Sequence, residues 1–310
     1  MKIYDLVIIG AGPAGITAAI YASRKRLDTL VISKDIGGQA ALSGDVENYT
    51  GYQFISGPEL ALKFEEHLKK FDITLKEGEA VLELGKAGNL VSVRTDKGVY
   101  EAKSAIIASG KRSRELGCPG EKEFKNKGLT YCATCDGPLF GGKDVAVIGG
   151  GNSALDAAIQ LIKIANKIYL VNIAESLTGD TVMREIVEAN PKVTILNKAR
   201  VSAILGDRMV HSIRVNSADK EELLAVKGVF VEIGLIPNSE FVPGVEKNDL
   251  REIKVNSYNE TNVPGIFAAG DVTDVPEKQI VIAAGEGSKA ALGVFKYLIH
   301  NPTGRQAKIS

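Results

Sequence analysis

Two cysteines at a spacing suited to redox chemistry are the residues of this sequence most able to do chemistry. Cys132 and Cys135 stand in the segment Cys-Ala-Thr-Cys-Asp, and the chain has one further cysteine, Cys118. A pair at this spacing can close a small disulfide ring, and in a reducing compartment such a pair is more often redox-active or metal-binding than structural. Asp136 follows directly, where it could donate a proton or cap a helix.

A metal site is the alternative use of the cysteine pair. A structural zinc ion needs four ligands. Beyond the pair, the chain offers only Cys118 and the scattered residues His67, His211 and His300, with no second close pair. We therefore expect no metal site and favour redox chemistry, and we assign no role to Cys118, since lone cysteines usually act as small apolar residues.

An internal repeat indicates the elements that position these cysteines. Residues 8–22 read IIGAGPAGITAAIYA, and residues 147–161 read VIGGGNSALDAAIQL. Each segment is an apolar strand, a glycine-rich turn and a helical stretch rich in small residues, which is the start of a dinucleotide-binding unit. The sequence therefore predicts an α/β fold with two Rossmann-like dinucleotide-binding domains.

The second domain is predicted to be inserted in the first. The segment GIFAAGDV (265–272) is a further strand that has no other sheet to join, so it should return to the first domain. We place the first domain at residues 1–113 and 246–310, and the second at residues 114–245. The two crossings, RSRELGCPGE and PNSEFVPGVE, are rich in Pro, Gly and charge, as linkers tend to be.

Local patterns predict the other elements more coarsely. Residues 58–71 have apolar residues at helical spacing, and residues 72–102 alternate apolar and polar around turns, which favours an antiparallel meander. AIIASG (105–110) is a short buried strand, and GVFVEIG (228–234) parallels it in the second half. The segment KAALGVFKYLIH near the C-terminus is predicted to be helical.

The two glycine-rich turns predict phosphate binding. In the first turn, Gly10 permits the tight turn, Gly12 lets the backbone approach a pyrophosphate, and Gly15 lets helix and strand pack closely. The N-terminus of the following helix then faces the phosphates with its unpaired N–H groups. The second turn, residues 149–154, has the same form with Ala in place of the last glycine. Asp35 is the nearest acidic candidate for a ribose of the first dinucleotide.

Composition narrows the class of protein. The chain has 310 residues, enough for about two domains. Lys and Arg together number 38, as do Asp and Glu, so no overall basic field recruits nucleic acid. No apolar run reaches the ~18 residues needed to span a membrane. The N-terminus lacks a signal-peptide pattern and the cysteines form no secreted framework, so we expect a cytoplasmic protein.

Taken together, the motifs resemble those of the low-molecular-weight thioredoxin reductases, class II flavoprotein pyridine-nucleotide disulfide oxidoreductases. Residues 136–300 also resemble the reductase part of the alkyl hydroperoxide reductase flavoprotein subunit. The matching segments occur in the family's order and are GAGPAG (10–15), GGQ (37–39), VENY (46–49), CATCD (132–136), GGGNSA (149–154), GLIPN (234–238), GIFAAGDV (265–272) and KQIVIAAGEG (278–287).

The resemblance implies FAD in the first domain and NADH or NADPH in the second. The residues implied for FAD are Gly10, Gly12, Pro13, Ala14, Gly15, Gly38, Gln39, Asn48, Gly110, Gly270, Asp271, Lys278, Gln279 and Ile280. Those implied for the nicotinamide dinucleotide are Gly149, Gly151, Asn152, Ser153, Ala154, Asn172, Glu175 and Gly234.

The resemblance also implies a reaction. A reduced nicotinamide passes hydride to FAD, and reduced FAD opens a Cys132–Cys135 disulfide. Cys135 is the flavin-facing cysteine, Cys132 attacks the disulfide of a thioredoxin- or glutaredoxin-like protein, and Asp136 is the acid. The family works as a homodimer. The alternatives are a same-fold flavoprotein with another donor, such as ferredoxin, and a non-catalytic flavin-binding redox sensor.

The residues expected to select the electron donor differ from the family pattern. NADPH-using relatives carry a His-Arg-Arg run where this chain reads Asn172-Ile173-Ala174. A 2′-phosphate is normally bound by Arg or Lys side chains, so we expect NADH to be used at least as well as NADPH. The remaining cations that could reach a phosphate are Lys163, Lys167 and Arg184.

Overall fold

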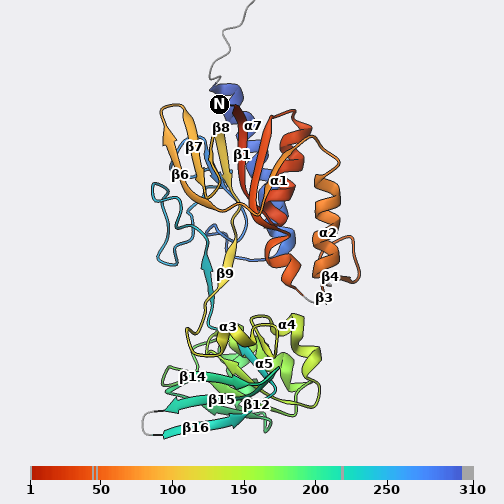
Figure 1. Cartoon of the computed structure of the whole chain (residues 1–310), viewed down its shortest axis with the longest axis vertical. Helices are drawn as coiled ribbons and strands as arrows, with labels where there is room; N and C mark the ends of the chain where they lie inside the picture. Colours follow the sequence, from red (N-terminus) through yellow and green to blue (C-terminus); the bar gives the residue numbers. More distant parts are fainter. Residues whose placement is uncertain (1, 44, 47, 218–219, 302–310) are drawn as a thin grey trace, which may run out of the picture. The chain divides into compact units, whose positions relative to one another are not determined.

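The chain divides into two compact units, Met1–Arg112 with Ile236–Ser310 and Ser113–Leu235 (Figure 1). The computed structural model describes residues 2–43, 45–46, 48–217 and 220–301, without the side chains of Asp45, Ala87 and Cys135. Both units combine helices with parallel strands, so the predicted α/β fold is confirmed.

The first unit is built on one sheet with the strand order β5-β2-β1-β8-β7-β6, and β19 pairs with β8 beside this path. Its parallel strands are β1 (Ile3–Ala11), β2 (Thr29–Ile36), β5 (Thr74–Glu77), β8 (Val99–Ile107) and β19 (Ile266–Ala268). The pairing of β19 with β8 confirms that the segment GIFAAGDV returns to the first sheet.

The antiparallel part of this sheet begins later in the chain than residue 72, where the predicted meander starts. β6 (Val81–Ala87) and β7 (Leu90–Thr95) pair antiparallel with each other, and β7 pairs antiparallel with β8. β5, which the prediction included in the meander, instead runs parallel to β2. The helix between β2 and β5 explains the difference, because a helical crossover returns the chain in the same direction.

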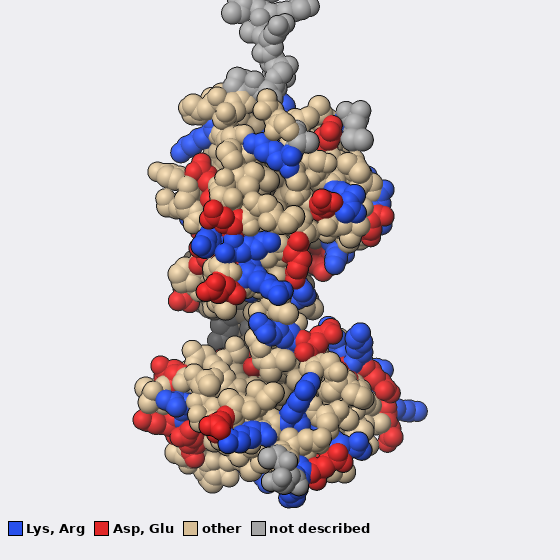
Figure 2. All heavy atoms as spheres, turned by 90° about the vertical axis from the view of Figure 1, so that its left-hand side faces the viewer, with Lys and Arg blue, Asp and Glu red and all other residues tan. Residues whose placement is uncertain are grey.

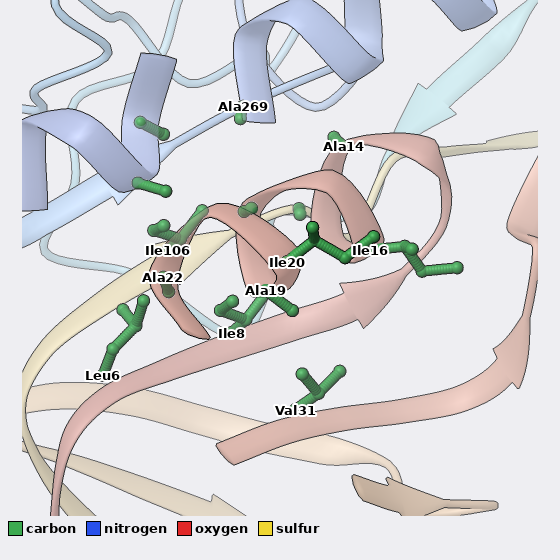
Figure 3. Close-up of a cluster of buried hydrophobic side chains, with 14 of the residues drawn as sticks. Leu6, Ile8, Ala14, Ile16, Ala19, Ile20, Ala22, Val31, Ile106 and Ala269 are labelled. Atoms are coloured by element: carbon green, nitrogen blue, oxygen red, sulfur yellow. The ribbon is translucent and has the colours of Figure 1, made fainter. Parts of the chain in front are cut away.

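The central strand separates two apolar layers. Leu6 and Ile8 of β1 pack with Ile16 of α1 (Pro13–Arg24), and the long helix α7 (Ile280–His300) joins this layer (Figure 3). Val7 and Ile9 point to the other face, where they pack with residues of β7 and of the 242–272 segment. Both faces are therefore covered, which suits a continuous apolar strand.

Helix α2 (Gly57–Leu68) lies within the range predicted from the periodicity, 58–71, apart from its first residue. It begins with a capping box, in which the Ser56 side chain accepts from the Glu59 N–H and Glu59 accepts from the Ser56 N–H. The 3-10 helix η1 (Gly38–Leu42) and the short strands β3 (Asp45–Val46) and β4 (Ile55–Ser56) precede it.

The second unit contains a parallel sheet with the order β10-β17-β11-β12-β13. These strands are β10 (Leu129–Thr130), β11 (Asp144–Ile148), β12 (Lys167–Val171), β13 (Val193–Leu196) and β17 (Gly228–Val231). The helices are α3 (Glu121–Phe124), α4 (Ala133–Asp136), α5 (Asn152–Ile162) and α6 (Thr181–Glu188), with the 3-10 helix η2 (Gly137–Phe140). An antiparallel sheet follows in the chain, with β14 (Ala199–Gly206), β15 (Val210–Ser217) and β16 (Lys220–Ala225).

The second crossing between the units differs from the predicted boundary at residue 245. Residues 236–245 belong to the first unit: Phe241 O accepts from Leu84 N at 2.8 Å, and Val242 and Val245 are buried in the first unit's core. Burial of these valines holds the segment there. At the crossings themselves, β9 (Lys111–Ser113) and β18 (Leu235–Pro237) form a two-stranded sheet.

The surface carries charges of both signs. On the face drawn in Figure 2, basic and acidic side chains are interspersed, in keeping with the equal numbers of each in the sequence. Among the described residues, no helix is long and apolar enough to cross a membrane.

Replacing Gly287 by Ala is expected to destabilise the first unit. A Cβ at Gly287 would lie 2.0 Å from the carbonyl oxygen of Ala14. The substitution would push α7 away from α1, at a cost of about 1–3 kcal/mol in the free energy of unfolding, as measured by urea denaturation.

Gly285→Ala in the same helix is the matched control. No heavy atom lies within 4 Å of a Cβ there, so the variant should gain up to about 1 kcal/mol, because Ala favours a helix over Gly. Equal stability of the two variants would contradict the close packing of α1 and α7.

Candidate active site

The first glycine-rich turn depends on close approaches of backbone to backbone. A Cβ at Gly10 would lie 2.3 Å from Ala108 O, and a Cβ at Gly15 would lie 1.8 Å from Gly10 O. Gly10 also has a φ of +105°, which L side chains rarely adopt. The roles predicted for Gly10 as the tight turn and for Gly15 as the packing position therefore agree with the geometry.

Open space lies over the middle of this turn. Gly12 caps the N-terminus of α1, and a Cβ placed there would have only Gly37 O within 4 Å, at 3.9 Å. Gly38 approaches Gly12, since its Cβ would lie 3.4 Å from the Gly12 Cα. An anion such as a pyrophosphate could approach the backbone here, next to the unpaired N–H groups of α1. The turn, including Pro13, fits a dinucleotide.

The other residues predicted for FAD gather at the same end of the sheet. Gly270, two residues after β19, lies against Ala14, because its Cβ would be 2.9 Å from the Ala14 Cβ. Asn48 Nδ2 donates to Gln279 Oε1 at 3.1 Å, immediately before Ile280 begins α7.

Gln39 provides a further link across this end of the sheet. Its side-chain Nε2 donates to the carbonyl oxygen of Lys111 at 3.0 Å. Lys111 follows Gly110, which has a φ of +62° and lies shortly after β8. Asp35, the candidate for the first ribose, lies exposed near the end of β2. Ser33 is buried instead and accepts from Ala11 N at 3.0 Å.

A buried charge cluster lies beside Asp271. Burial opposes ionisation of Glu252, but hydrogen bonds from Lys111 (2.7 Å), Asn248 (2.7 Å) and Lys278 outweigh it and lower the pKa of Glu252 to about 2. Burial raises the pKa of Asp271, and the charges of Lys278 and Lys111 only partly oppose that shift. Lys278 Nζ also donates to Thr273 O at 2.6 Å.

The second glycine-rich turn repeats this arrangement. A Cβ at Gly149 would lie 2.3 Å from Glu232 O. Gly151 caps α5 and faces open space, since only Thr178 Oγ1 would lie within 4 Å of its Cβ, at 4.0 Å. Ser153 is exposed in the first turn of α5 and Ala154 is buried below it. This turn therefore also fits a dinucleotide.

Hydrogen bonds of Asn172 stabilise the loop after β12, which is predicted to contact the ribose of the nucleotide. Asn172 is 3% exposed, and its Nδ2 donates to Ser176 O and Asn197 Oδ1, both at 2.9 Å. Its Oδ1 accepts from Ala174 N at 3.2 Å. The side chain thus stabilises the loop under Gly150, and the expected contact of Asn172 with a nucleotide stays a prediction.

The remaining nucleotide-site residues lie around this loop and at the crossing. Asn152 Oδ1 accepts from Asp180 N at 2.7 Å. Glu175 is 84% exposed and forms an ion pair with Lys198 at 2.7 Å. Gly234, with a φ of +94°, accepts at its carbonyl oxygen from Arg114 N at 3.0 Å.

The cations proposed as a phosphate clamp do not all lie near this site. Lys163 follows the C-terminus of α5, and Lys167 begins β12. The C-terminus of α5 lies about 16 Å along the helix from the glycines at its N-terminus. Arg184 lies closer and donates to Leu177 O and Thr181 Oγ1. Lys198 is a nearer cation that sequence reasoning missed, because the fold alone brings it to Glu175.

The cysteine segment leaves the same parallel sheet. Cys132 follows β10, is partly buried and is disulfide-bonded, and its N–H donates to Thr130 Oγ1 at 3.1 Å. Asp136 N donates to Cys132 O at 3.2 Å, and the Asp136 side chain makes no capping hydrogen bond, which removes the capping role considered for it. The side chain of Cys135 lies outside the described residues.

Two groups of the second unit were not singled out from the sequence as site residues. Glu121 is 2% exposed, and its carboxylate accepts from Leu116 N, Gly117 N and the Tyr131 hydroxyl at 2.6, 2.7 and 2.8 Å. It therefore fixes the residue that precedes Cys132. The second group is Glu232, which directly follows the apolar strand β17. An acidic residue that interrupts an apolar run is the feature of the sequence that could have identified it.

Cys118 is a free thiol packed at the edge of an apolar cluster. Burial and the nearby Glu121 raise its pKa, which disfavours the reactive thiolate. Among the described residues, no group of three or more His, Cys, Asp or Glu side chains is arranged to hold a metal ion.

Two glycine-rich turns that fit dinucleotides, and a disulfide-bonded cysteine that follows a strand of the same sheet as one of these turns, are typical of a nucleotide-dependent disulfide oxidoreductase. The chain belongs to the pyridine nucleotide-disulphide oxidoreductase family, whose model matches residues 4–287. Membership implies flavin and nicotinamide cofactors. The resemblance drawn from the motifs is thereby confirmed.

Known proteins similar to this chain carry three kinds of name. A thioredoxin reductase from Streptococcus pyogenes has 38% identity and a TM-score of 0.78, over 96% of this chain and 99% of that one. An "NADH dehydrogenase" of Ferdinandcohnia aciditolerans is 44% identical over 97% of this chain and 58% of its own length. An alkyl hydroperoxide reductase component of Pseudomonas putida is 43% identical over 96% and 58%. The last two proteins are curated relatives, and the chain spans about three fifths of the length of each.

Glu252→Gln is expected to destabilise the first unit in a pH-dependent way. A carboxyl with a lowered pKa contributes stability above its unfolded value of 4.5, and this is lost as the pH falls towards 2. The free energy of unfolding should drop by up to about 3 kcal/mol at pH 7, and the difference from the parent should shrink below pH 4.5.

Urea denaturation at several pH values measures this difference. Glu66→Gln is the control, since its ion pair is exposed and should contribute less than about 1 kcal/mol at any pH. A difference for Glu252→Gln that stayed constant between pH 7 and pH 3 would show that the charge of Glu252 is not responsible.

Proposed function

We infer that this chain is an FAD-dependent disulfide reductase that passes electrons from NADH or NADPH to a thioredoxin- or glutaredoxin-like protein. The observation that carries this inference is the disulfide at Cys132, two residues after β10, in the sheet whose strand β11 leads into a glycine-rich turn. The likeness to the thioredoxin reductase of S. pyogenes, over nearly the full length of both chains, supports the same function.

The cysteines do the protein's own part of the chemistry. When bound, the flavin relays two electrons from the nicotinamide to the Cys132–Cys135 disulfide. The Cys132 thiolate then attacks one sulfur of the substrate disulfide, that S–S bond breaks, and the other substrate sulfur leaves as a thiolate. Attack by Cys135 on the mixed disulfide restores the Cys132–Cys135 bond and releases the substrate with two thiols.

Asp136 supplies and accepts the proton in this scheme. Its N–H bonds to the Cys132 carbonyl, so it stays within one turn of the attacking cysteine. A side chain that caps no helix remains available for proton transfer. We further infer that the protein works as a homodimer, as the family resemblance implies.

A second candidate acceptor is a peroxide-reducing protein with a redox-active disulfide. The relative from P. putida, named as part of an alkyl hydroperoxide reductase, is 43% identical over 96% of this chain. The observation favours a related partner, although this chain spans only 58% of that relative. Comparing oxidised thioredoxin with an oxidised peroxiredoxin as acceptors, at equal NADH, distinguishes the two candidates by kcat/KM.

Substituting either cysteine of the pair is expected to abolish thioredoxin reduction. Cys132→Ser removes the attacking thiolate, and Cys135→Ser leaves a mixed disulfide that cannot be resolved. NADH-dependent reduction of thioredoxin by the flavin-loaded variants should fall at least a hundredfold, and Cys135→Ser should form a covalent adduct with thioredoxin that reductant releases.

Cys118→Ser is the matched control, because this free thiol packs at the edge of an apolar cluster. It should keep activity close to that of the parent. Near-parental turnover in Cys132→Ser would show that the pair is wrongly assigned.

NADH is expected to serve at least as well as NADPH. A 2′-phosphate would meet the charge of Glu175, and the nearby cation Lys198 is already paired with it. Ile173, 74% exposed in the same loop, offers no charge. Glu175→Gln should release Lys198 and raise the NADPH-to-NADH ratio of kcat/KM about two- to fivefold.

The ratio is measured by the rate of flavin reduction with each donor. Glu188→Gln, an exposed acid on α6, is the control and should leave the ratio unchanged. A hundredfold preference of the parent for NADPH would mean that another cation, with Arg184 the first to test, binds the phosphate.

A further inference from the structure

Glu232 lies between the two functional segments of the second unit. In the sheet order β10-β17-β11, strand β17 has the cysteine strand on one side and the glycine-turn strand on the other. Glu232 follows β17 directly, so it leaves the sheet at the edge where Cys132 follows β10 and Gly149 follows β11. Its N–H donates to Ile148 O at 2.8 Å, which fixes its backbone beside the glycine turn.

The Glu232 side chain turns towards the cysteine segment. The backbone of Ala133, the residue after Cys132, hydrogen bonds to the Glu232 carboxylate. Glu232 is only partly exposed. Burial raises its pKa to about 7, the charge of Asp156 adds to the shift, and the Ala133 hydrogen bond opposes it. The negative charge of Glu232 is thus gained or lost close to neutral pH.

Asp156 completes an acidic environment around this segment. It lies exposed on α5 and accepts from Gln160 Nε2 at 2.8 Å, while Gln160 Oε1 accepts from the Thr134 hydroxyl at 3.1 Å. The groups that act on Glu232 from the packed elements are therefore the Ala133 backbone from α4 and Asp156 from α5.

We propose that Glu232 is a positioning residue for the redox pair, holding the segment through Ala133 and setting by its charge how readily Cys132 forms a thiolate. Reduction of the disulfide by two electrons breaks the S–S bond and, with one proton supplied by Asp136, leaves one thiol and one thiolate. An ionised Glu232 disfavours the thiolate at Cys132, whereas a neutral Glu232 does not. The proposal rests on the proposed disulfide reductase function.

The test measures the reactivity of Cys132 in the full chain. In a Cys118→Ser, Cys135→Ser background, Cys132 is the single thiol, and its rate of alkylation by iodoacetamide is followed from pH 5 to pH 10 by mass spectrometry. With Glu232 present, the rate should rise in two steps, because two coupled groups titrate. Glu232→Gln should leave one step and raise the rate at pH 7 about threefold or more.

Two further variants make the test specific. Asp156→Asn, on an exposed position, should move the first step to lower pH because it removes a charge that raises the pKa of Glu232. Glu222→Gln, an exposed acid on β16, should leave the curve unchanged. A Glu232→Gln curve that superposes on the parent curve, or an unmoved first step in Asp156→Asn, would overturn the proposal.

The readout is independent of the proposed function. Alkylation needs no nicotinamide, electron transfer or thioredoxin. A chain that fails to reduce thioredoxin but shows the two-step curve would refute the function alone. A chain that reduces thioredoxin but shows a single step would refute only the role of Glu232.

Discussion

At both glycine-rich turns, the backbone of a neighbouring segment occupies the space that a side chain would need. Ala108 O lies 2.3 Å from the Cβ position of Gly10, and Glu232 O lies 2.3 Å from that of Gly149. This close approach holds the end of β1 against the end of β8, and the end of β11 against the end of β17. Because most of the candidate site residues lie where the chain leaves these ends, the rest of each site depends on it.

Two carboxyl groups that are largely removed from water, one in each unit, have pKa shifts of opposite direction. In the first unit, two lysines and an asparagine hydrogen bond to Glu252 and lower its pKa to about 2, so it stays ionised. In the second unit, burial and the charge of Asp156 raise the pKa of Glu232 to about 7. The same chemical group thus serves as a fixed charge in one place and as a titrating one in the other, because its neighbours differ.

The structure differs from the sequence-based expectations where long-range packing outweighs local pattern. The alternation of residues 72–102 favoured an antiparallel meander, but the helix before β5 returns that first strand parallel to β2. The Pro- and Gly-rich crossing resembled a linker to residue 245, but Val242 and Val245 are buried in the first unit. The amide of Asn172, a residue predicted to contact a nucleotide, also forms hydrogen bonds within its own loop.

The sequence by itself determined the α/β fold, the two dinucleotide turns, the redox-type cysteine spacing and the family, because each depends on residues close together in the chain. Only the tertiary structure brought Asn48 to Gln279, 231 residues apart, paired Lys198 with Glu175 and set Glu232 beside Ala133. Contacts of this kind follow from strand order and burial, and no local spacing of residue types records which distant side chains a sheet will bring to one edge.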